Sequence, residues 1–378
     1  MLSFKSILKK SQVLKGQLPV INKLCTFQQK QASSADHLAK YGQGGRNSFN
    51  GIVATVFGAT GYLGRYVVNR LARSGAQVIV AYRGVEDDFR HLRVMGEIGQ
   101  INFLHFDLKD YESILKAMSH SNTVINLISR NYSTRNFSME ECLVYGAERI
   151  ANAAAESEVK QLIHMSALNA KGSSPSTFLQ AKARSERKVA EQFHDATIMR
   201  PAEFYGHEDR YFNKYAYLRK LPLGVPLVKG GWQTTRRPVF VSDVARGVVK
   251  ATGDWTTKGK TYELYGPEEY YLHDILSYIF RMIRKPLRVI PVPEQAFSLA
   301  GWAGEMTFFS PKLTRDMVVR QFLSEEVNDD AYTFEDLGIT PANMNVVAPE
   351  ILRRHRDYYH FDQIVEESEY CKPVSAYE

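Results

Sequence analysis

The stretch IVATVFGATGYLG, residues 52–64, decides the fold of this chain. Its first six residues form an apolar run rich in β-branched side chains, which predicts a buried strand. Three glycines then recur at every third position. Leu63, Val67 and Leu71 have a spacing of four residues, so they share one face of a predicted helix. A strand, a glycine-rich turn and a helix therefore follow one another directly.

Each glycine of this turn has a predicted role in binding the pyrophosphate of a dinucleotide. The chain turns tightly at Gly58, the backbone approaches the pyrophosphate at Gly61, and the helix packs on the strand at Gly64. The pyrophosphate would face free N–H groups at the positive end of the helix dipole. The alternative is a turn with a purely structural role. The residues of this turn predicted to bind nucleotide are Gly58, Thr60, Gly61, Tyr62, Leu63 and Gly64.

The alternation of strands and helices continues and predicts an α/β fold with a doubly wound, parallel, Rossmann-type sheet. Further strands are expected at 77–82, 101–106, 123–128, 161–165 and 196–199, and helices at about 111–118, 139–156 and 178–193. In such sheets the ligand binds beyond the carboxyl ends of the strands. The residues predicted to contact nucleotide there are Arg83, Asp107, Leu108, Leu127, Ser166 and Pro201.

Arg83, at the end of the second predicted strand, indicates which dinucleotide is bound. In NAD-binding folds an acid at this place bonds the ribose 2′-hydroxyl, and that acid would repel a 2′-phosphate. A guanidinium can instead pair with the phosphate in a bidentate fork. Arg83 therefore favours NADPH, against the alternative of a solvated surface arginine. Asp107 ends the third strand, where it can reach the adenine edge or cap the following helix.

The glycine turn, Asp107-Leu108, Ser166 and Arg200-Pro201 together resemble the short-chain dehydrogenase/reductase superfamily, in its extended or atypical branch. Active members carry a Tyr-x-x-x-Lys pair, in which the lysine lowers the pKa of the tyrosine so that its phenol can exchange a proton with the substrate. Lys182 matches the lysine, but Phe178 stands at the tyrosine position. The resemblance therefore implies a cofactor site in which Lys182 bonds the nicotinamide ribose, and no catalytic residue.

A substitute proton donor would have to come from another part of the chain. Tyr205 and Tyr211 follow the sixth strand and His164 lies on the fifth, but none of them lies one turn before Lys182. His164 is better explained as a core residue of a buried strand. The sequence therefore predicts a protein that is not an enzyme. It also holds no pattern typical of a metal site or a nucleophile elbow.

The basic character of the chain belongs to its first 35 residues. The net charge is +7, and residues 1–35 hold six lysines and no acid. Removing these six lysines from the 48 basic residues leaves 42, against 41 acidic residues. The rest of the chain is therefore nearly neutral. This argues against nucleic acid as a partner, because nucleic-acid binding needs a basic face. The lysines alternate with apolar residues, which predicts a mitochondrial targeting presequence; the alternative is a disordered basic tail.

Composition suggests how the rest of the chain is organised. The expected parts are a flexible lead-in at 36–50, a dinucleotide-binding domain at 51–202, a smaller α+β region interleaved with it at 203–345, and a tail at 346–378. No stretch approaches the roughly 20 apolar residues of a transmembrane helix. Residues 286–311 predict a buried helix, with a short amphipathic segment on a membrane surface as the alternative. The basic and aromatic segment 352–361 favours a protein-binding tail.

The presequence-like arm, the NADPH-type site and Phe178 in combination resemble the nucleotide-binding accessory subunits of mitochondrial respiratory complex I, in its alpha subcomplex. This resemblance implies a non-catalytic subunit on the matrix side of the inner membrane, in the peripheral arm near the quinone site. Its partners would be other complex I subunits, and bound NADPH would support assembly or stability without donating hydride. Peripheral contact with inner-membrane lipid stays open. So do two alternatives, an NADPH-dependent reductase or epimerase with a substitute proton donor, and a regulatory NADPH sensor.

The assignment of Arg83 to the 2′-phosphate leads to a binding prediction. Arg83→Ala is expected to weaken NADPH binding by at least about tenfold, because a charge-assisted pair is lost. NADH lacks the 2′-phosphate, so its dissociation constant is expected to change little. Titration of both nucleotides into both forms of the protein measures this difference. Equal losses for the two nucleotides would contradict the assignment.

Overall fold

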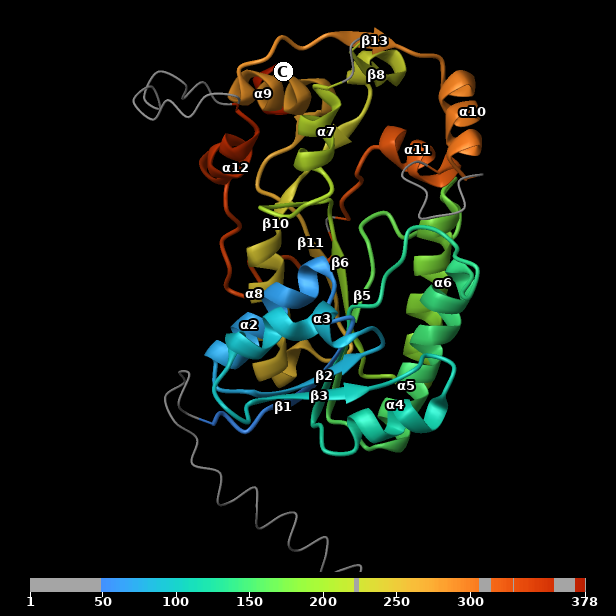
Figure 1. Ribbon diagram of the computed structural model, residues 1–378, viewed down its shortest axis with the longest axis vertical. Helices are drawn as coiled ribbons and strands as arrows, with labels where there is room; N and C mark the ends of the chain where they lie inside the picture. Colours follow the sequence, from blue (N-terminus) through green and yellow to red (C-terminus); the bar gives the residue numbers. More distant parts are fainter. Residues whose placement is uncertain (1–48, 221–223, 306–313, 329, 357–370, 378) are drawn as a thin grey trace, which may run out of the picture.

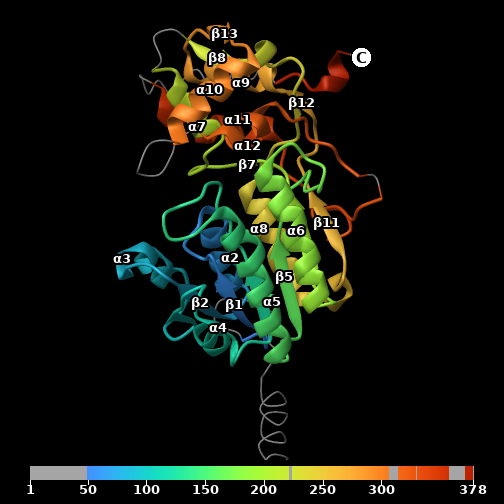
Figure 2. The ribbon, with the colours of Figure 1, turned by 90° about the vertical axis from the view of Figure 1, so that its right-hand side faces the viewer.

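The computed structural model describes residues 49–220, 224–305, 314–328, 330–356 and 371–377. The predicted presequence and most of the predicted lead-in lie outside these residues. The described chain is arranged in two tiers, a larger one built on a sheet and a smaller, mainly helical one above it (Figures 1 and 2).

The larger tier contains a seven-stranded parallel sheet. Its strands are β1 (Val53–Phe57), β2 (Gln77–Tyr82), β3 (Ile101–His105), β4 (Thr123–Asn126), β5 (Gln161–Met165), β6 (Thr197–Pro201) and β11 (Thr261–Leu264). They lie in the order β11-β6-β5-β4-β1-β2-β3. Because β2 and β4 both flank β1, the topology switches there, and ligands of doubly wound folds bind beside this point. The predicted parallel sheet is confirmed.

Helices cover both faces of this sheet (Figure 1). One face carries α2 (Tyr62–Arg73) and α8 (Val241–Gly253), and the other carries α4 (Tyr111–Met118), α5 (Gly146–Glu156) and α6 (Thr177–Gln192). The predicted stripe of α2 is buried, since Leu63, Val67 and Leu71 all belong to the core between α2, α8 and the sheet. A π-helical turn, Glu141–Tyr145, leads into α5, and α3 (Glu86–Phe89) with the 3-10 helix Arg90–Met95 joins β2 to β3.

The smaller tier has an apolar core of its own. Its elements are β7 (Phe204–Tyr205), α7 (Phe212–Leu218), β8 (Val225–Leu227), β9 (Thr235–Arg236), β10 (Val239–Phe240), β12 (Tyr270–Tyr271), α9 (Leu272–Ile283), β13 (Val289–Pro291), α10 (Glu294–Glu305), α11 (Arg315–Phe322) and α12 (Met344–Leu352). Short 3-10 turns lie at Val228–Gly231, Trp255–Thr257, Arg353–His355 and Val374–Ala376. Phe212, Tyr278 and Ile279 are buried in this core.

The chain crosses between the two tiers more than once. After β10 it returns to the sheet as α8 and β11, and then leaves again for α9. Ala348, Ile351 and Leu352 of α12 are buried in the smaller core, although they belong to the predicted tail. The exact domain boundaries stay a prediction. Part of the segment 352–361 lies outside the described residues.

Helix α10 differs from its expected burial. Phe297 is 9% exposed and stacks edge-on against Phe322 of α11, whereas Leu299 is 64% and Trp302 44% exposed. The prediction of a buried helix is therefore wrong for α10, because only one of its faces packs against a neighbour. Across the described ranges, no helix is long and apolar enough to cross a membrane.

The close contact at Gly64 predicts a stability difference between two glycines. A Cβ at Gly64 would lie 2.5 Å from the carbonyl oxygens of Gly58 and Ala59, whereas a Cβ at Gly253, the last residue of α8, would meet nothing within 4 Å. Gly64→Ala is expected to lower the free energy of unfolding by about 1–3 kcal/mol. Gly253→Ala is the matched control and is expected to be neutral or slightly stabilising. Denaturant titrations compare the two, and equal midpoints would refute the steric argument.

Candidate functional site

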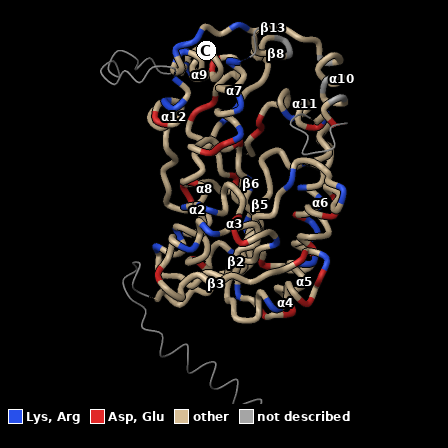
Figure 3. The backbone as a smooth tube through the Cα atoms, viewed as in Figure 1, with Lys and Arg blue, Asp and Glu red and all other residues tan. Residues whose placement is uncertain are grey.

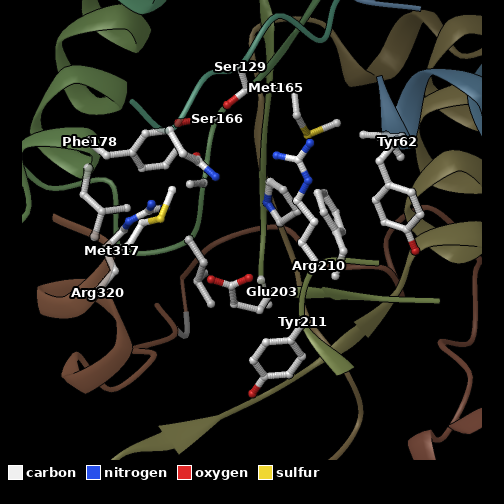
Figure 4. Close-up of a pocket in the computed structure, with 18 of the residues that line it drawn as sticks. Tyr62, Ser129, Met165, Ser166, Phe178, Glu203, Arg210, Tyr211, Met317 and Arg320 are labelled. Atoms are coloured by element: carbon white, nitrogen blue, oxygen red, sulfur yellow. The ribbon is translucent and has the colours of Figure 1, made fainter. Parts of the chain in front are cut away.

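A cavity of about 570 Å³ lies where the carboxyl ends of the parallel strands face the smaller tier. Its walls come from the glycine turn, from the segments that follow β4, β5 and β6, from the start of α6, and from α7 and α11. Figure 4 shows this cavity with its lining side chains. It therefore occupies the place where the topology of the sheet predicts a ligand.

The backbone of the glycine turn is packed too tightly for other residues. Gly58 has a φ of +80°, and a Cβ there would lie 3.0 Å from the carbonyl carbon of Leu127. Gly61 is the N-cap of α2, where no side chain caps the helix and the first turn carries no acid. The first backbone N–H groups of α2 thus lack a side-chain acceptor at the edge of the cavity. This arrangement suits a phosphate group.

Most residues of the predicted nucleotide site come together here. Those that line the cavity are Gly58, Gly61, Tyr62, Leu63, Gly64, Leu127, Ser166 and Pro201. Thr60, Arg83, Asp107, Leu108 and Lys182 are not among the lining residues. Their roles toward a nucleotide stay predictions.

Arg83 lies at the exposed end of β2, outside the cavity. Its guanidinium carbon is 4.9 Å from the ring centroid of Phe137. The ammonium of Lys109 lies 4.8 Å from the same ring. Two cations therefore gather beside one aromatic ring near the ends of β2 and β3, and the sequence analysis had identified only Arg83.

The neighbouring Asp107 does not cap a helix. Its carboxylate accepts a hydrogen bond from the backbone N–H of Lys109 at 3.0 Å. The N-cap of α4 is Asp110, which accepts from the backbone N–H of Glu112 at 3.2 Å. The expectation that Asp107 caps the helix is therefore wrong, because α4 begins later than that role requires. Leu108 is buried.

Phe178 and Lys182, which the sequence analysis compared with a Tyr-x-x-x-Lys pair, lie at the start of α6. Phe178 lines the cavity and is 6% exposed. Lys182 is buried behind it and donates a hydrogen bond from Nζ to the carbonyl oxygen of Met165 at 2.8 Å. Burial lowers the pKa of Lys182 to about 8. The Ser166 hydroxyl is buried in the cavity wall without a hydrogen-bond partner in the described chain, so it is a polar group that a ligand could satisfy.

Of the three side chains considered as substitute proton donors, His164 and Tyr205 have partners elsewhere in the fold and Tyr211 lines the cavity. His164 is buried between Asn126 and Ser185, at 3.3 and 2.9 Å, and burial lowers its pKa to about 3, so it is a satisfied core residue as predicted. Tyr205 donates its hydroxyl to the carbonyl oxygen of Ala342 at 3.3 Å. Tyr211 lines the cavity, and its buried hydroxyl has no partner among the residues that the structure describes.

Helix α11 closes the cavity over Phe178, and the sequence analysis missed it. The guanidinium carbon of Arg320 lies 4.3 Å from the ring centroid of Phe178. Asp316 accepts hydrogen bonds from the Ser176 and Thr177 hydroxyls at 2.8 and 2.9 Å, and from the Phe178 N–H at 3.3 Å. A carboxylate thus caps the N-terminus of α6 from a distant part of the chain. Thr314 caps α11 through a hydrogen bond from the backbone N–H of Met317.

A second carboxylate fixes the chain that follows α11. Glu325 is buried, and its two carboxylate oxygens accept from Arg236 Nη1 at 3.2 Å and from the backbone N–H of Arg237 at 2.7 Å. The Glu325 N–H in turn donates to the carbonyl oxygen of Thr235. The segment after α11 is therefore held against β9 along one wall of the cavity.

The cavity carries an excess of positive charge. Its charged lining residues are Arg130, Arg210, Lys214, Arg236 and Arg320 against Glu203 and Glu325. In the view of Figure 3, basic and acidic residues are interspersed along the described chain. The excess is therefore local, and it suits a polyanionic ligand. Where the chain is described, no cluster of His, Cys, Asp or Glu could hold a metal ion.

Comparison with known proteins defines the class of this site. A family model described as NAD(P)H-binding matches residues 58–251. The fold is similar to the NADPH-dependent quinone oxidoreductase of Escherichia coli complexed with NADPH (18% identity, 79% of this chain and 98% of that chain, TM-score 0.61). It is equally similar to the Citrobacter triphenylmethane reductase complexed with NADP(H) (16%, 80% and 99%, TM-score 0.62). The fold and the site are those of NAD(P)H-binding Rossmann proteins.

Within this class the chain belongs to the family of mitochondrial NADH dehydrogenase [ubiquinone] 1 alpha subcomplex subunit 9. It is 44% identical to the mouse protein of that name over 335 residues, which are 89% of each chain. The Arabidopsis thaliana protein of the same name is 41% identical, over 85% of this chain and 82% of its own. The 40 kDa subunit of Neurospora crassa NADH-ubiquinone oxidoreductase is 39% identical, over 85% and 84%. The family resemblance inferred from the sequence is confirmed.

The hydrogen bonds of Asp316 predict its contribution to stability. Asp316→Ala removes the carboxylate that caps α6 and is expected to lower the free energy of unfolding by about 1–2 kcal/mol. Asp87→Ala, at the exposed start of α3, is the control and is expected to change it by less than about 0.5 kcal/mol. Denaturant unfolding measures both, and equal values for the two variants would contradict the capping role.

Proposed function

We propose that this chain is a non-catalytic accessory subunit of mitochondrial complex I that holds NADPH as a structural ligand. The names of its relatives support both its membership in complex I and its location in mitochondria, since they are named as mitochondrial subunits of NADH-ubiquinone oxidoreductase. Other complex I subunits are then its partners. We place it on the matrix side of the inner membrane, in the peripheral arm near the quinone site, with residues 1–35 as the import signal.

The observation that carries the non-catalytic role is Phe178 in the cavity wall. Reduction of a carbonyl requires a proton donor beside the nicotinamide as well as a hydride. A phenyl ring has no proton to give, and the Lys182 ammonium is already directed to the Met165 carbonyl. The cavity is therefore suited to hold the nucleotide, but position 178 offers no acid that would use it.

The choice of NADPH over NADH rests on the end of β2. Arg83 and Lys109 both lie within 5 Å of the Phe137 ring centroid, so two cations stand where the adenosine ribose is expected. No acid ends β2 to repel a 2′-phosphate. These charges favour the phosphorylated nucleotide.

A bound nucleotide of this kind acts on stability rather than on turnover. NADPH that binds only the folded chain stabilises it by about 2.7 kcal/mol at 100 times its dissociation constant. It would also fill the space between the sheet and α11, which lie on opposite sides of the cavity. The filled cavity then presents a fixed surface to neighbouring subunits.

One observation favours the alternative of an atypical reductase. Tyr211 is one of the tyrosines that line the cavity, and of the three substitute donors considered from the sequence it is the one that the structure places there. Burial raises the pKa of Tyr211 well above its usual value, which makes it a poor acid–base catalyst near neutral pH. In the view of Figure 4 its hydroxyl also points away from Ser166 and Phe178. Substrate-dependent oxidation of NADPH by the isolated protein would support this alternative.

The structural role predicts an assembly defect when the nucleotide is excluded. Gly61→Asp places a carboxylate at the N-terminus of α2, where it would repel the pyrophosphate. The variant is expected to lose bound nucleotide and to reduce the amount of assembled complex I, measured by native electrophoresis of mitochondria. Gly253→Asp adds the same charge where a Cβ meets nothing and is the matched control. Normal assembly with an empty cavity would refute the proposal.

A further inference from the structure

The two halves of a dinucleotide have distinct places in this cavity. In doubly wound sheets the dinucleotide lies across the switch point, with its pyrophosphate at the glycine turn. The adenosine half then lies toward the ends of β2 and β3, and the nicotinamide half lies toward the ends of β4, β5 and β6. Leu127, Ser166 and Pro201 mark that second end of the cavity. In Figure 4 Phe178 lies beside Ser166, and Arg320 lies below Phe178.

The guanidinium of Arg320 is the fixed positive charge at this end. Its side chain is only 16% exposed and stacks on the Phe178 ring. Arg320 lines the cavity, whereas its ion-pair partner Asp316, with an Nε–Oδ2 distance of 3.2 Å, does not. The carboxylate therefore lies behind the guanidinium as seen from the cavity. It also accepts hydrogen bonds at the N-terminus of α6, which further offsets its charge.

Apart from its partner Asp316, the acids among the described lining residues, Glu203 and Glu325, form no ion pair with Arg320. Glu325 is committed to Arg236 at 3.2 Å, and Lys182 adds a second cation beneath Phe178. Glu203 also lines the cavity, but Arg210 and Lys214 line it as well and exceed its charge. A ligand ring next to Phe178 therefore meets a positive potential.

The two redox forms of the nucleotide respond differently to such a potential. Their phosphates are identical, but the nicotinamide ring is a cation in NADP⁺ and neutral in NADPH. A fixed cation near the ring would repel the oxidised form, which is charged, much more than the reduced form, which is neutral. We infer that Arg320 makes the cavity selective for NADPH over NADP⁺. This inference rests on the proposed nucleotide site and adds a preference for one redox form.

Substitutions at Arg320 test whether its charge, rather than its size and shape, determines the preference for NADPH. The full chain is expected to bind NADPH at least about tenfold more tightly than NADP⁺. Arg320→Gln is expected to reduce this ratio by about tenfold, chiefly by tightening NADP⁺, whereas Arg320→Lys keeps the charge and is expected to preserve the ratio. Asp316→Asn removes the negative charge that opposes Arg320, so it is expected to raise the ratio of NADPH affinity to NADP⁺ affinity. Calorimetric titration of each nucleotide measures all four proteins, and circular dichroism establishes that each is folded.

The outcomes distinguish this inference from the proposed function. Equal affinity of the unaltered chain for NADPH and NADP⁺ would overturn the inference while leaving nucleotide binding intact. An unchanged ratio in a folded Arg320→Gln protein would also overturn it. Binding of neither form would refute the nucleotide site and the inference together. If Arg320→Gln does not fold, the ratio of the unaltered chain and the opposite shift in Asp316→Asn decide the question.

Discussion

Two carboxylates hold the chain after α10 across the carboxyl ends of the sheet, and the cavity depends on them. Asp316 caps α6 through three hydrogen bonds, and Glu325 binds Arg236 and the backbone of Arg237. Both carboxylates satisfy donors that would otherwise be left without partners near the cavity, and an unsatisfied buried donor costs about 1–3 kcal/mol. The segment 314–328 is therefore tied to both tiers of the molecule.

The cavity that results has two chemically different ends. At the glycine turn it offers the uncapped first turn of α2, which suits phosphate. At the other end it offers Phe178 beneath Arg320, a ring and a cation in place of a phenol. Binding energy at the first end can hold a dinucleotide, while the phenyl ring of Phe178 at the second end has no proton to give. In the proposed function such a site uses its ligand to stabilise the fold.

The nucleotide-binding part of the fold could be predicted because its motifs are formed by neighbouring residues. Contacts between residues far apart in the chain have no such motif in the sequence. The glycine turn of β1 and α2 combines strand, turn and helix signals within 20 residues, so both its structure and its ligand class follow from the sequence. The cap was the competing role predicted for Asp107, and the structure gives it to Asp110 three residues later, because the sequence offers two aspartates before the helix. Asp316 meets Phe178 across 138 residues, and nothing in a short stretch of helix α11 indicates that contact.

The sequence by itself determined the parallel sheet, the glycine turn and the absence of a tyrosine at position 178, because each is a property of neighbouring residues. Only the tertiary structure decided what surrounds Phe178. It placed Arg320 on the ring and Asp316 at the start of α6, left Ser166 without a partner in the described chain, and directed Lys182 to a backbone carbonyl. These contacts join segments far apart in the chain, and their electrostatics exist only once packing has excluded water.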